Sequence, residues 1–362
     1  MSVQKLRVGI VGCGEVTQII HLPALHQLGD RFEVTALCDV SRVVLDGVGD
    51  QWGVASRYLE YDGLIDDANV DAVLVANPHA YHADVVLTAI DAGKHVLVEK
   101  PMCMTFREAD AIIDACERTG VTVQVGYMRR YAPAFVQACT LVQDLPKITL
   151  ARVHDVIGQN ALIVDRTSKV IRGTDIAPLL VTRAKARQDA LVAEAIGDAP
   201  LALQNAYLVL LALSSHDLSA MRELLGMPQR VLHASMRQAG TYITAAFDYG
   251  EYVCQFETGI DSIPRFDGYI EVYGPEDVIR VQYDTPYVRH LPITLHVTKA
   301  NDQGGVSTQV THPTWGDPFV VAWHAFYDNV TQRLRPKTDP EDFRRDLELF
   351  ERMVVHMRAP EA

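Results

Sequence analysis

The feature that most constrains the fold is a regular alternation of short β-branched runs with longer helical patterns over residues 7–124. Strands that alternate with helices predict a parallel sheet, because parallel neighbours need a long crossover between them. Right-handed crossovers place helices on both faces of such a sheet. We therefore expect a doubly wound α/β domain, with strands at 8–11, 34–38, 72–75, 96–98 and 121–125 and helices at 16–28, 41–52, 82–92 and 106–118.

The pattern changes after Pro133. A strand-like run at 148–156 is followed by a largely helical stretch at 175–225 and then by consecutive strand-like runs from 231 to 310. Such blocks predict an α+β domain with a large, mostly antiparallel sheet. Turn residues at 249–251, 267–268 and 274–277 are expected between these strands, and two helices, at 318–333 and 340–357, are expected after them.

The length of the chain, 362 residues, favours two domains over one. We expect the first domain to span 1–125 and the second, a substrate-binding and oligomerisation domain, to span 126–362. The last helices are free to pack back on the first domain.

The charge and cysteine content exclude several functional classes. The formal net charge of -13 repels nucleic acid and anionic membranes, so neither is an expected partner. The chain starts with a strand-like stretch instead of an apolar signal region, and no apolar run is long enough to span a bilayer. Its six cysteines lack CxxC or metal-ligand spacing. We expect a cytoplasmic protein without a metal site.

A glycine pattern follows the first strand. Gly12 permits a tight turn, Gly14 allows close approach of the backbone to phosphates, and the helix that follows aims its N-terminal amides at the loop. Thr17 stands where a third small residue is usual. The sequence predicts that a dinucleotide pyrophosphate binds here, with contacts from Gly12, Cys13, Gly14, Glu15 and Val16.

The second strand ends at Asp39, where a carboxylate accepts hydrogen bonds from the adenosine ribose. A carboxylate also repels a 2'-phosphate, which favours NAD over NADP. Arg42 is near enough to pair with a phosphate and weakens that preference. Asp39, Val40 and Arg42 are thus predicted cofactor contacts, although Asp39 can also be read as a turn residue at a strand end.

Lys100 follows another strand, so its side chain is expected at the carboxyl edge of the sheet, where ligands of doubly wound folds bind. Oxidation of a secondary alcohol needs a group that accepts the hydroxyl proton. A lysine that is partly shielded from water and near other cations has its pKa lowered toward neutrality, so it can accept this proton. Alternatively, Lys100 is an ordinary surface lysine.

Four stretches together resemble the Gfo/Idh/MocA oxidoreductases, the glucose-fructose oxidoreductase and inositol dehydrogenase type. They are the glycine loop at 12–14 and residues 77–82, 92–101 and 124–131, of which Glu99-Lys100-Pro101 is the most diagnostic. The resemblance covers nearly the whole chain and is closest over the first 135 residues or so.

The resemblance implies a role for each matching residue. Lys100 would hydrogen-bond the reacting hydroxyl, and Glu99 and Pro101 would shape the nicotinamide pocket. Further cofactor contacts would come from Asn77, Pro78, His79, His82 and Arg129, and the substrate cleft would include Lys100, Arg130, Tyr131, His154 and His216.

His216 matches the second catalytic position of the family, but the usual aspartate four residues earlier is Ala212. His216 can still exchange a proton near neutral pH, or it can be a structural histidine. Asp155, Asp175 and Asp217 are three carboxylates that could replace the missing group, and the sequence does not choose among them.

The stretch 160–204 is longer than the resemblance implies and contains a mixed-charge region at 183–189. We expect a solvated amphipathic helix there. A helix before His216 could also roof the cleft and select a bulky substrate such as a glycoside.

The function expected first is reversible hydride transfer between NAD and a hydroxyl of a sugar, polyol or glycoside, with Lys100 and His216 handling the proton. One alternative is an NAD-dependent glycoside hydrolase or lyase that oxidises the sugar transiently. Another is a non-catalytic, nucleotide-binding regulator. A homo-oligomer of two, four or six chains is expected, because outward apolar residues of 269–273 would need cover.

Overall fold

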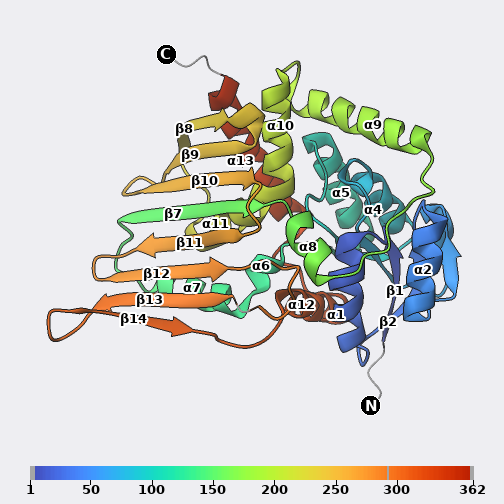
Figure 1. Cartoon of the computed structure of the whole chain (residues 1–362), viewed down its shortest axis with the longest axis horizontal. Coiled ribbons are helices and arrows are strands. Elements are labelled where there is room, and N and C mark those ends of the chain that lie inside the picture. Colours follow the sequence, from blue (N-terminus) through green and yellow to red (C-terminus); the bar gives the residue numbers. More distant parts are fainter. Residues whose placement is uncertain (1–4, 292, 359–362) are drawn as a thin grey trace. The chain divides into compact units, whose positions relative to one another are not determined.

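The computed structural model describes residues 5–291 and 293–358, so the first four residues of the expected leaderless N-terminus lie outside the described part. The chain forms two compact units, whose elements are labelled in Figure 1. Unit 1 comprises Met1–Tyr127, Ser168–Gly197 and Phe319–Leu347, and unit 2 comprises Met128–Thr167, Asp198–Pro318 and Glu348–Ala362. The chain first leaves unit 1 close to the boundary expected at residues 125 and 126, and then returns to it twice.

Unit 1 contains a six-stranded parallel sheet in the order β3-β2-β1-β4-β5-β6. This is the doubly wound arrangement expected from the sequence. The strands are β1 (Leu6–Val11), β2 (Phe32–Cys38), β3 (Ser56–Tyr58), β4 (Ala72–Val75), β5 (His95–Val98) and β6 (Val123–Val125). The sequence pattern missed β3, because its three half-buried residues form no apolar run.

The helices of unit 1 include all four that were expected. Capping residues set the ends of two of them, α2 and α5. Ser41 and Thr105 cap their N-termini, and Gly53 and Gly120 end them with positive φ. The elements are a π-helical turn η1 (Thr17–His21), α1 (Leu22–Gln27), α2 (Arg42–Trp52), α3 (Tyr61–Ile65), η2 (His79–Tyr81), α4 (His82–Asp91), α5 (Phe106–Thr119), α9 (Pro178–Ile196) and α12 (Pro318–Gln332).

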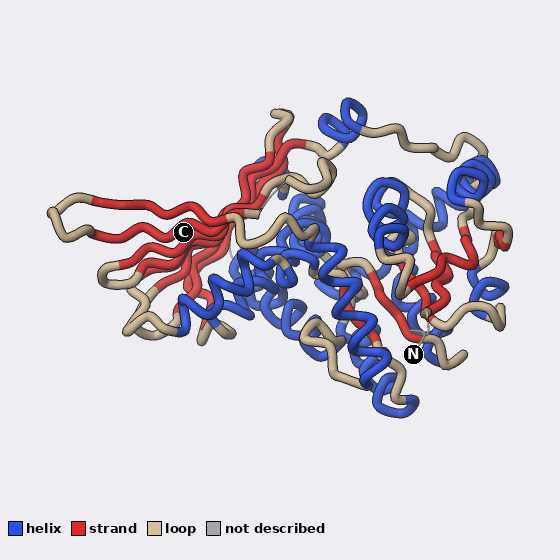
Figure 2. The backbone as a smooth tube through the Cα atoms, turned by 90° about the horizontal axis from the view of Figure 1, so that it is seen from below, coloured by secondary structure: helices blue, strands red, loops and turns tan. Residues whose placement is uncertain are grey.

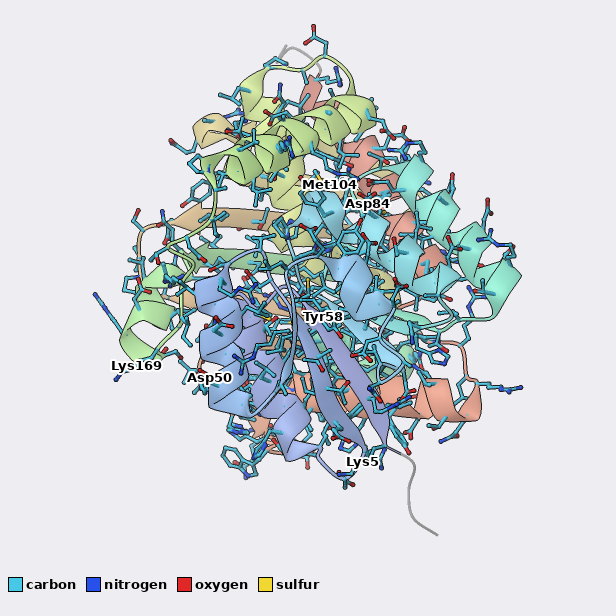
Figure 3. All side chains as sticks on the ribbon, turned by 90° about the vertical axis from the view of Figure 1, so that its right-hand side faces the viewer. Lys5, Asp50, Tyr58, Asp84, Met104 and Lys169 are labelled. Atoms are coloured by element: carbon cyan, nitrogen blue, oxygen red, sulfur yellow. The ribbon has the colours of Figure 1, made fainter. Side chains whose placement is uncertain are left out.

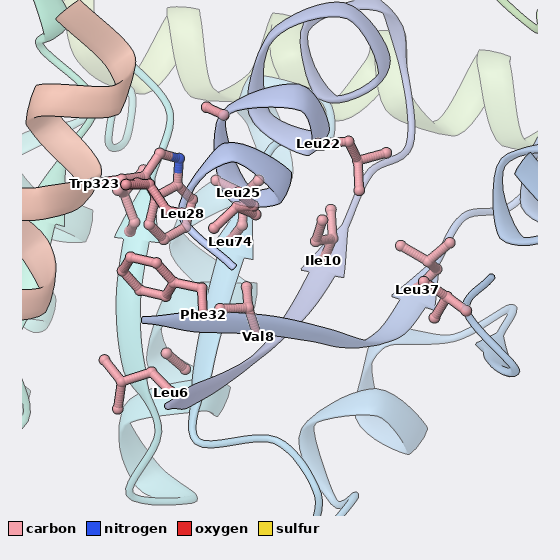
Figure 4. Packing of buried hydrophobic residues seen from close by; sticks show 14 of the residues in the cluster. Leu6, Val8, Ile10, Leu22, Leu25, Leu28, Phe32, Leu37, Leu74 and Trp323 are labelled. Atoms are coloured by element: carbon pink, nitrogen blue, oxygen red, sulfur yellow. The ribbon is translucent and has the colours of Figure 1, made fainter. Parts of the chain in front are cut away.

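The core of unit 1 lies between the sheet and the helices beside β1 (Figure 4). Val8 and Ile10 of β1 are fully buried against Leu25 of α1. Trp323 of α12 joins this cluster, with its ring centroid 5.2 Å from that of Phe32. A segment near the end of the chain therefore completes a core that the first strands begin.

Unit 2 contains an eight-stranded sheet in the order β14-β13-β12-β11-β7-β10-β9-β8, which Figure 1 labels. Figure 2 draws the strands in red. β7 and β10 are parallel and the other neighbours are antiparallel, which confirms the expected mostly antiparallel sheet. The strands are β7 (Leu150–Gly158), β8 (Arg230–Arg237), β9 (Tyr242–Asp248), β10 (Val253–Asp261), β11 (Phe266–Tyr273), β12 (Asp277–Tyr283), β13 (Thr294–Ala300) and β14 (Val306–Thr311).

The expected turns at 249–251 and 274–277 join neighbouring strands, but the turn expected at 267–268 is wrong. Gly268 lies inside β11, opposite Asp155 of β7. A Cβ atom at Gly268 would stand 2.8 Å from Oδ1 of Asp155. The glycine is therefore needed for close approach of a buried carboxylate and not for a turn.

Helices α7 and α11 pack against strands of this sheet. The helical elements of unit 2 are α6 (Met128–Tyr131), α7 (Pro133–Gln143), α8 (Ala161–Thr167), α10 (Leu201–Val209), a π-helical turn η3 (Leu210–Ser214), α11 (Ser215–Leu225) and a short 3-10 turn η4 (Gln238–Gly240). The final helix, α13 (Pro340–Arg358), begins in unit 1 and ends in unit 2.

Among the described residues, no single helix is long and apolar enough to cross a membrane. In the described part of the chain, one bent pair of helices, Pro178–Ile196 with Leu201–Leu225, reaches the required length and apolarity when the two are taken together.

Candidate active site

Four loops with the predicted cofactor residues meet at the carboxyl edge of the unit 1 sheet. They follow β1, β2, β4 and β5, which are neighbours in the order β2-β1-β4-β5. Because the strands are parallel, their carboxyl ends share one edge. The glycine loop, Asp39, Asn77 and Lys100 therefore come from adjacent positions along it.

The two glycines of the glycine loop have different surroundings. Gly12 has φ +95°, and a Cβ atom there would lie 2.4 Å from the carbonyl oxygen of Ala76. A Cβ atom at Gly14, in contrast, would meet nothing within 4 Å among the described residues. Gly12 thus permits packing between the β1 and β4 loops, and Gly14 leaves open space where a ligand can approach the backbone.

Thr17, the departure from the usual third small residue, has a role of its own. Its hydroxyl is buried and donates a 2.6 Å hydrogen bond to the carbonyl of Gly12. The threonine therefore fastens the first helical turn to the glycine loop.

Asp39 joins the loops after β1 and β2. Its two carboxylate oxygens accept hydrogen bonds from the backbone amides of Cys13 and Ser41, each at 2.9 Å. These bonds hold the carboxylate beside the glycine loop, where an adenosine ribose is recognised. Val40 and Arg42, which follow it at the start of α2, are exposed.

His82 ties the loop after β4 to the loop after β5. Its Nδ1 lies 2.7 Å from the carbonyl oxygen of Pro101, and its Nε2 lies 2.7 Å from that of Asn77. Burial lowers the pKa of His82, although both carbonyls act in the opposite direction. Burial, with smaller effects from His82 and Lys100, also holds the pKa of His79 well below its usual value.

Asn77 carries a buried polar atom that suits a ligand. Its Oδ1 has no hydrogen-bond partner among the described residues. A buried amide oxygen is costly to leave unpaired. Together with the open space at Gly14 and the anchored carboxylate of Asp39, it shows that the residues at this edge fit a dinucleotide.

Glu99 is held by two residues that the sequence gave no reason to connect. Nε2 of His21 lies 2.9 Å from Oε1 of Glu99, and the indole nitrogen of Trp323 donates to Nδ1 of His21 at 3.1 Å. Because Nδ1 accepts this bond, a neutral His21 carries its proton on Nε2 and donates it to Glu99.

Burial raises the pKa of Glu99, but the hydrogen bond and charge of His21 and the effects of Lys100 together outweigh burial, so the net pKa is lowered. Its second oxygen accepts from the backbone amide of Lys100 at 3.1 Å. The carboxylate therefore fixes the backbone immediately before the half-buried Lys100.

Unit 2 contains a buried ionic cluster around Arg129. Its guanidinium donates to Asp217 of α11 and, at 3.1 Å, to Asp155 of β7. The rings of Phe266 and Tyr283 lie 5.3 and 4.9 Å from the guanidinium carbon. These contacts support a structural role within unit 2 for Arg129, which the sequence placed among the cofactor contacts.

In this cluster the pKa of Asp217 and the pKa of Arg129 are both raised, but for different reasons. Burial raises the pKa of Asp217 well above its usual value, against the opposing effect of Arg129. Burial alone would lower the pKa of Arg129, but Asp155 and Asp217 raise it. Arg129 is therefore a permanent cation, and Asp217 holds its proton more tightly than an exposed aspartate does.

His154, a predicted substrate residue, and Asp155, a candidate for the missing carboxylate, lie on opposite faces of the unit 2 sheet. Asp155 points to the buried face of β7, and His154, its neighbour, points to the other face. There His154 stacks on Tyr269 and lies 3.2 Å from Glu257. The structure thus does not place His154 on the face of Asp155, because successive residues of a strand alternate.

The other predicted residues lie on helices of unit 2. His216 is buried on α11, directly before Asp217, and Ala212 is in the π-helical turn that precedes this helix. Arg130 and Tyr131 are buried on α6, and Nε of Arg130 donates to Glu223. The joint action of Lys100 and His216 remains a prediction.

Of the three carboxylates that could replace the aspartate missing at Ala212, two belong to this cluster. Asp155 and Asp217 share Arg129. Asp175 has another partner, because it accepts a hydrogen bond from the hydroxyl of Ser41 in unit 1.

The mixed-charge region expected to be a solvated amphipathic helix is α9, and this prediction is confirmed. Most of α9 is exposed, whereas Leu191, Val192 and Ile196 are buried. Arg187 pairs with Asp84 at 2.7 Å and lies over the ring of Tyr81 (Asp84 is labelled in Figure 3). α9 is therefore attached to α4 of unit 1.

The sheet order, glycine loop and strand-end carboxylate define unit 1 as a Rossmann dinucleotide-binding unit. Residues 6–127 match the model of the Gfo/Idh/MocA family, described as an oxidoreductase family with an NAD-binding Rossmann fold. The match lies in the stretch where the sequence motifs predicted a resemblance to this family.

The curated relatives are similar over a stretch of comparable length. An inositol 2-dehydrogenase of Salmonella typhimurium is 33% identical over 141 residues, which are 38% of this chain and 42% of the relative. An inositol 2-dehydrogenase of Paracoccus denitrificans is 38% identical over 43% of this chain and 48% of its own length. A D-xylose 1-dehydrogenase (NADP(+)) of Haloferax volcanii is 34% identical over 37% of this chain and 41% of its own length. The chain thus matches less than half the length of each.

Solved structures share the fold over nearly the whole chain. The aldose-aldose oxidoreductase of Caulobacter crescentus has a TM-score of 0.75 at 20% identity and covers 98% of both chains. A levoglucosan dehydrogenase in complex with NADH and levoglucosan has a TM-score of 0.74 at 18% identity, covering 98% of this chain and 97% of the other. These likenesses extend the fold assignment to unit 2.

Proposed function

We propose that this protein is an NAD-dependent oxidoreductase that transfers a hydride between nicotinamide and a hydroxyl or carbonyl carbon of a sugar, polyol or glycoside. The observation that carries the proposal is the gathering of the glycine loop, Asp39, Asn77 and Lys100 at one sheet edge. The relatives named above act on inositol or xylose, which supports a polyhydroxylated substrate.

The chain supplies proton handling and orientation to this reaction. When bound, nicotinamide supplies the acceptor for the hydride that leaves the substrate carbon. Nζ of Lys100 takes the hydroxyl proton in the oxidation direction and returns it in reduction. Glu99, fixed by His21, holds the backbone of Lys100 in place.

NAD is the proposed cofactor because Asp39 is anchored where it would face the ribose and repel a 2'-phosphate. The related structures were solved with NADH in one case and NADP in another, a 3-ketoreductase of Actinomadura kijaniata. The choice between NAD and NADP therefore depends on residues of this chain. All six cysteines are free, which supports a reducing compartment such as the cytoplasm.

Nucleotide titration followed by a panel of sugars and polyols tests the proposal. The wild-type chain should bind NADH, and one or more panel members should produce NADH absorbance from NAD. Lys100→Ala should lower kcat at least about 100-fold and leave the Kd for NADH within about threefold, because general acid-base groups contribute that much to rate. Lys185→Ala removes an exposed lysine of α9 and is the matched control.

The outcomes separate the alternatives. A chain that takes up no nicotinamide nucleotide contradicts the proposal. Cleavage of a glycoside with NAD retained and no net NADH would instead establish the hydrolase or lyase. Nucleotide binding without turnover of any panel member, unaffected by Lys100→Ala, would favour a regulator.

A further inference from the structure

Residues 168–177 of unit 1, here called the strap, lie against the glycine loop. The side-chain amide of Gln18 forms two hydrogen bonds with the backbone of Ile171: the nitrogen donates to its carbonyl, and the oxygen accepts from its amide, both at 2.8 Å. The same nitrogen donates to the carbonyl of Cys13 at 2.8 Å. Gln18 therefore links the strap directly to the loop expected to hold the pyrophosphate.

Further contacts hold the strap on both sides of the glycine loop. Arg172 forms an ion pair with Glu15 at 3.2 Å. The side chain of Ile171 packs so close to α2 that a Cβ atom at Gly47 would lie 2.8 Å from it. Gly173 approaches Ser41 equally closely, because a Cβ atom there would be 2.9 Å from the serine hydroxyl.

The strap ends with a carboxylate at the N-terminus of α2. Asp175 accepts a hydrogen bond from the hydroxyl of Ser41 and another from the backbone amide of Val43, the latter at 3.2 Å. The hydrogen bond from Ser41, followed by those from the backbone, lowers the pKa of Asp175. A negative charge thus occupies the first turn of the helix that follows Asp39.

These donors are the groups that a 2'-phosphate would need. A phosphate on the ribose held by Asp39 would be directed toward the start of α2, with Ser41, the first amides of the helix and Arg42 as its partners. Asp175 already uses the hydroxyl and one of the amides. A phosphate brought to the same place would lose those donors and meet a like charge.

We propose that Asp175 is a specificity-determining residue that excludes the 2'-phosphate of NADP, so that the strap makes the site selective for NAD. The inference rests on the proposed function only to the extent that the chain binds a nicotinamide dinucleotide. It assigns to the stretch before α9 a part in the cofactor site. The sequence had placed that site after β1, β2, β4 and β5 and at Arg129 of α6.

Equilibrium binding of NADH and NADPH to the full chain, followed by nucleotide fluorescence, tests the proposal without substrate. Asp175→Asn removes the charge and keeps an acceptor for Ser41, so NADPH should bind about tenfold or more tightly, with NADH changed less than about threefold. Asp175→Ala should also raise the ratio of NADPH affinity to NADH affinity, because it frees the hydroxyl of Ser41 and the amide of Val43 as hydrogen-bond donors. Asp50→Ala removes an exposed carboxylate from the other end of α2 and should leave the ratio unchanged.

The proposal is overturned if Asp175→Asn leaves the NADPH to NADH affinity ratio at its wild-type value. It is also overturned if both nucleotides weaken equally, since Asp175 would then only cap α2. A wild-type chain that binds neither nucleotide refutes the proposed function itself, and that result is distinct from an unchanged ratio.

Discussion

At the scale of single residues, the buried charges of unit 2 are costly to keep out of water. Arg129, Asp155 and Asp217 are nearly or fully excluded from water, and each depends on the others for compensation. Removing one partner from such a cluster leaves a buried charge without its counterion. The cluster therefore makes unit 2 sensitive to single substitutions.

Arg129→Leu should lower the free energy of unfolding by about 3 to 5 kcal/mol, because Asp155 would lose its buried cation. Urea denaturation followed by circular dichroism measures the change. Arg230→Leu is the control, since Arg230 pairs with Asp248 at the surface and such pairs contribute about 0 to 1 kcal/mol. Equal losses in the two variants would contradict the role of the cluster.

Asp217 should make stability depend on pH. An unfolded aspartate titrates near pH ~3.9, whereas burial raises the pKa of Asp217 in the folded chain. The folded state then binds the proton more tightly, so its contribution to stability is present below the unfolded pKa and is lost as pH rises toward the folded pKa.

In Asp217→Asn the side chain resembles the protonated acid, so the variant should not lose this stability as pH rises. Relative to wild type, the Tm of the variant should increase between pH 4 and the folded pKa, as measured by scanning calorimetry at a series of pH values. Parallel Tm curves for the two proteins would show that Asp217 is not the group responsible.

At the scale of elements, Gly12 in the loop after β1 is subject to two constraints, a positive φ and close packing, of which Gly53 meets only the first. Gly12 and Gly53 both have positive φ, but only Gly12 also faces a neighbouring loop at a distance that excludes a Cβ atom. Alanine substitutions at Gly12 and Gly53 therefore separate the cost of a positive φ from the cost of a steric clash.

Gly12→Ala should abolish nucleotide binding and destabilise the chain by more than Gly53→Ala does. The latter should cost only about 1 to 2 kcal/mol, the penalty of a left-handed alanine, and should retain NADH binding. Thermal unfolding and NADH titration of both variants provide the measurement. Nucleotide affinity preserved in Gly12→Ala would exclude the glycine loop as the phosphate site.

The edge strand β14, and not β11, carries exposed apolar side chains in the unit 2 sheet. Ile270 and Val272 of β11 are buried, so the outward apolar residues expected there are absent, and Tyr269 instead lies 3.7 Å from the guanidinium of Arg280. The exposed apolar side chains lie on β14, where Val306 and Val310 are 73% and 50% exposed. Edge strands of this kind pair readily with another chain.

At the scale of the whole molecule, a homo-oligomer remains our prediction, now with β14 as the contact. Val310→Lys should lower the mass measured by light scattering, because a lysine on an edge strand opposes strand pairing. Val136→Lys adds the same charge at another half-exposed valine, on α7, and should leave the mass unchanged. A wild-type mass equal to one chain, or an oligomer insensitive to Val310→Lys, would contradict β14 as the interface.

The sequence by itself determined the local features of this protein. The order of strands and helices, the glycine loop and the carboxyl-edge positions of Asp39 and Lys100 follow from periodicity and strand ends, which are encoded within a few residues of one another. The sequence did not predict strand β3, because three residues carry too little periodicity.

Only the tertiary structure decided which distant side chains meet. Trp323 and His21 are 302 residues apart, Asp175 and Ser41 are 134 apart, and Arg129 and Asp217 are 88 apart. No local pattern encodes such pairs, because their energy arises only when the fold brings the two partners together and makes each the other's hydrogen-bonding group. The arrangement of buried polar groups therefore belongs to the fold, even where the elements that carry them can be read from the chain.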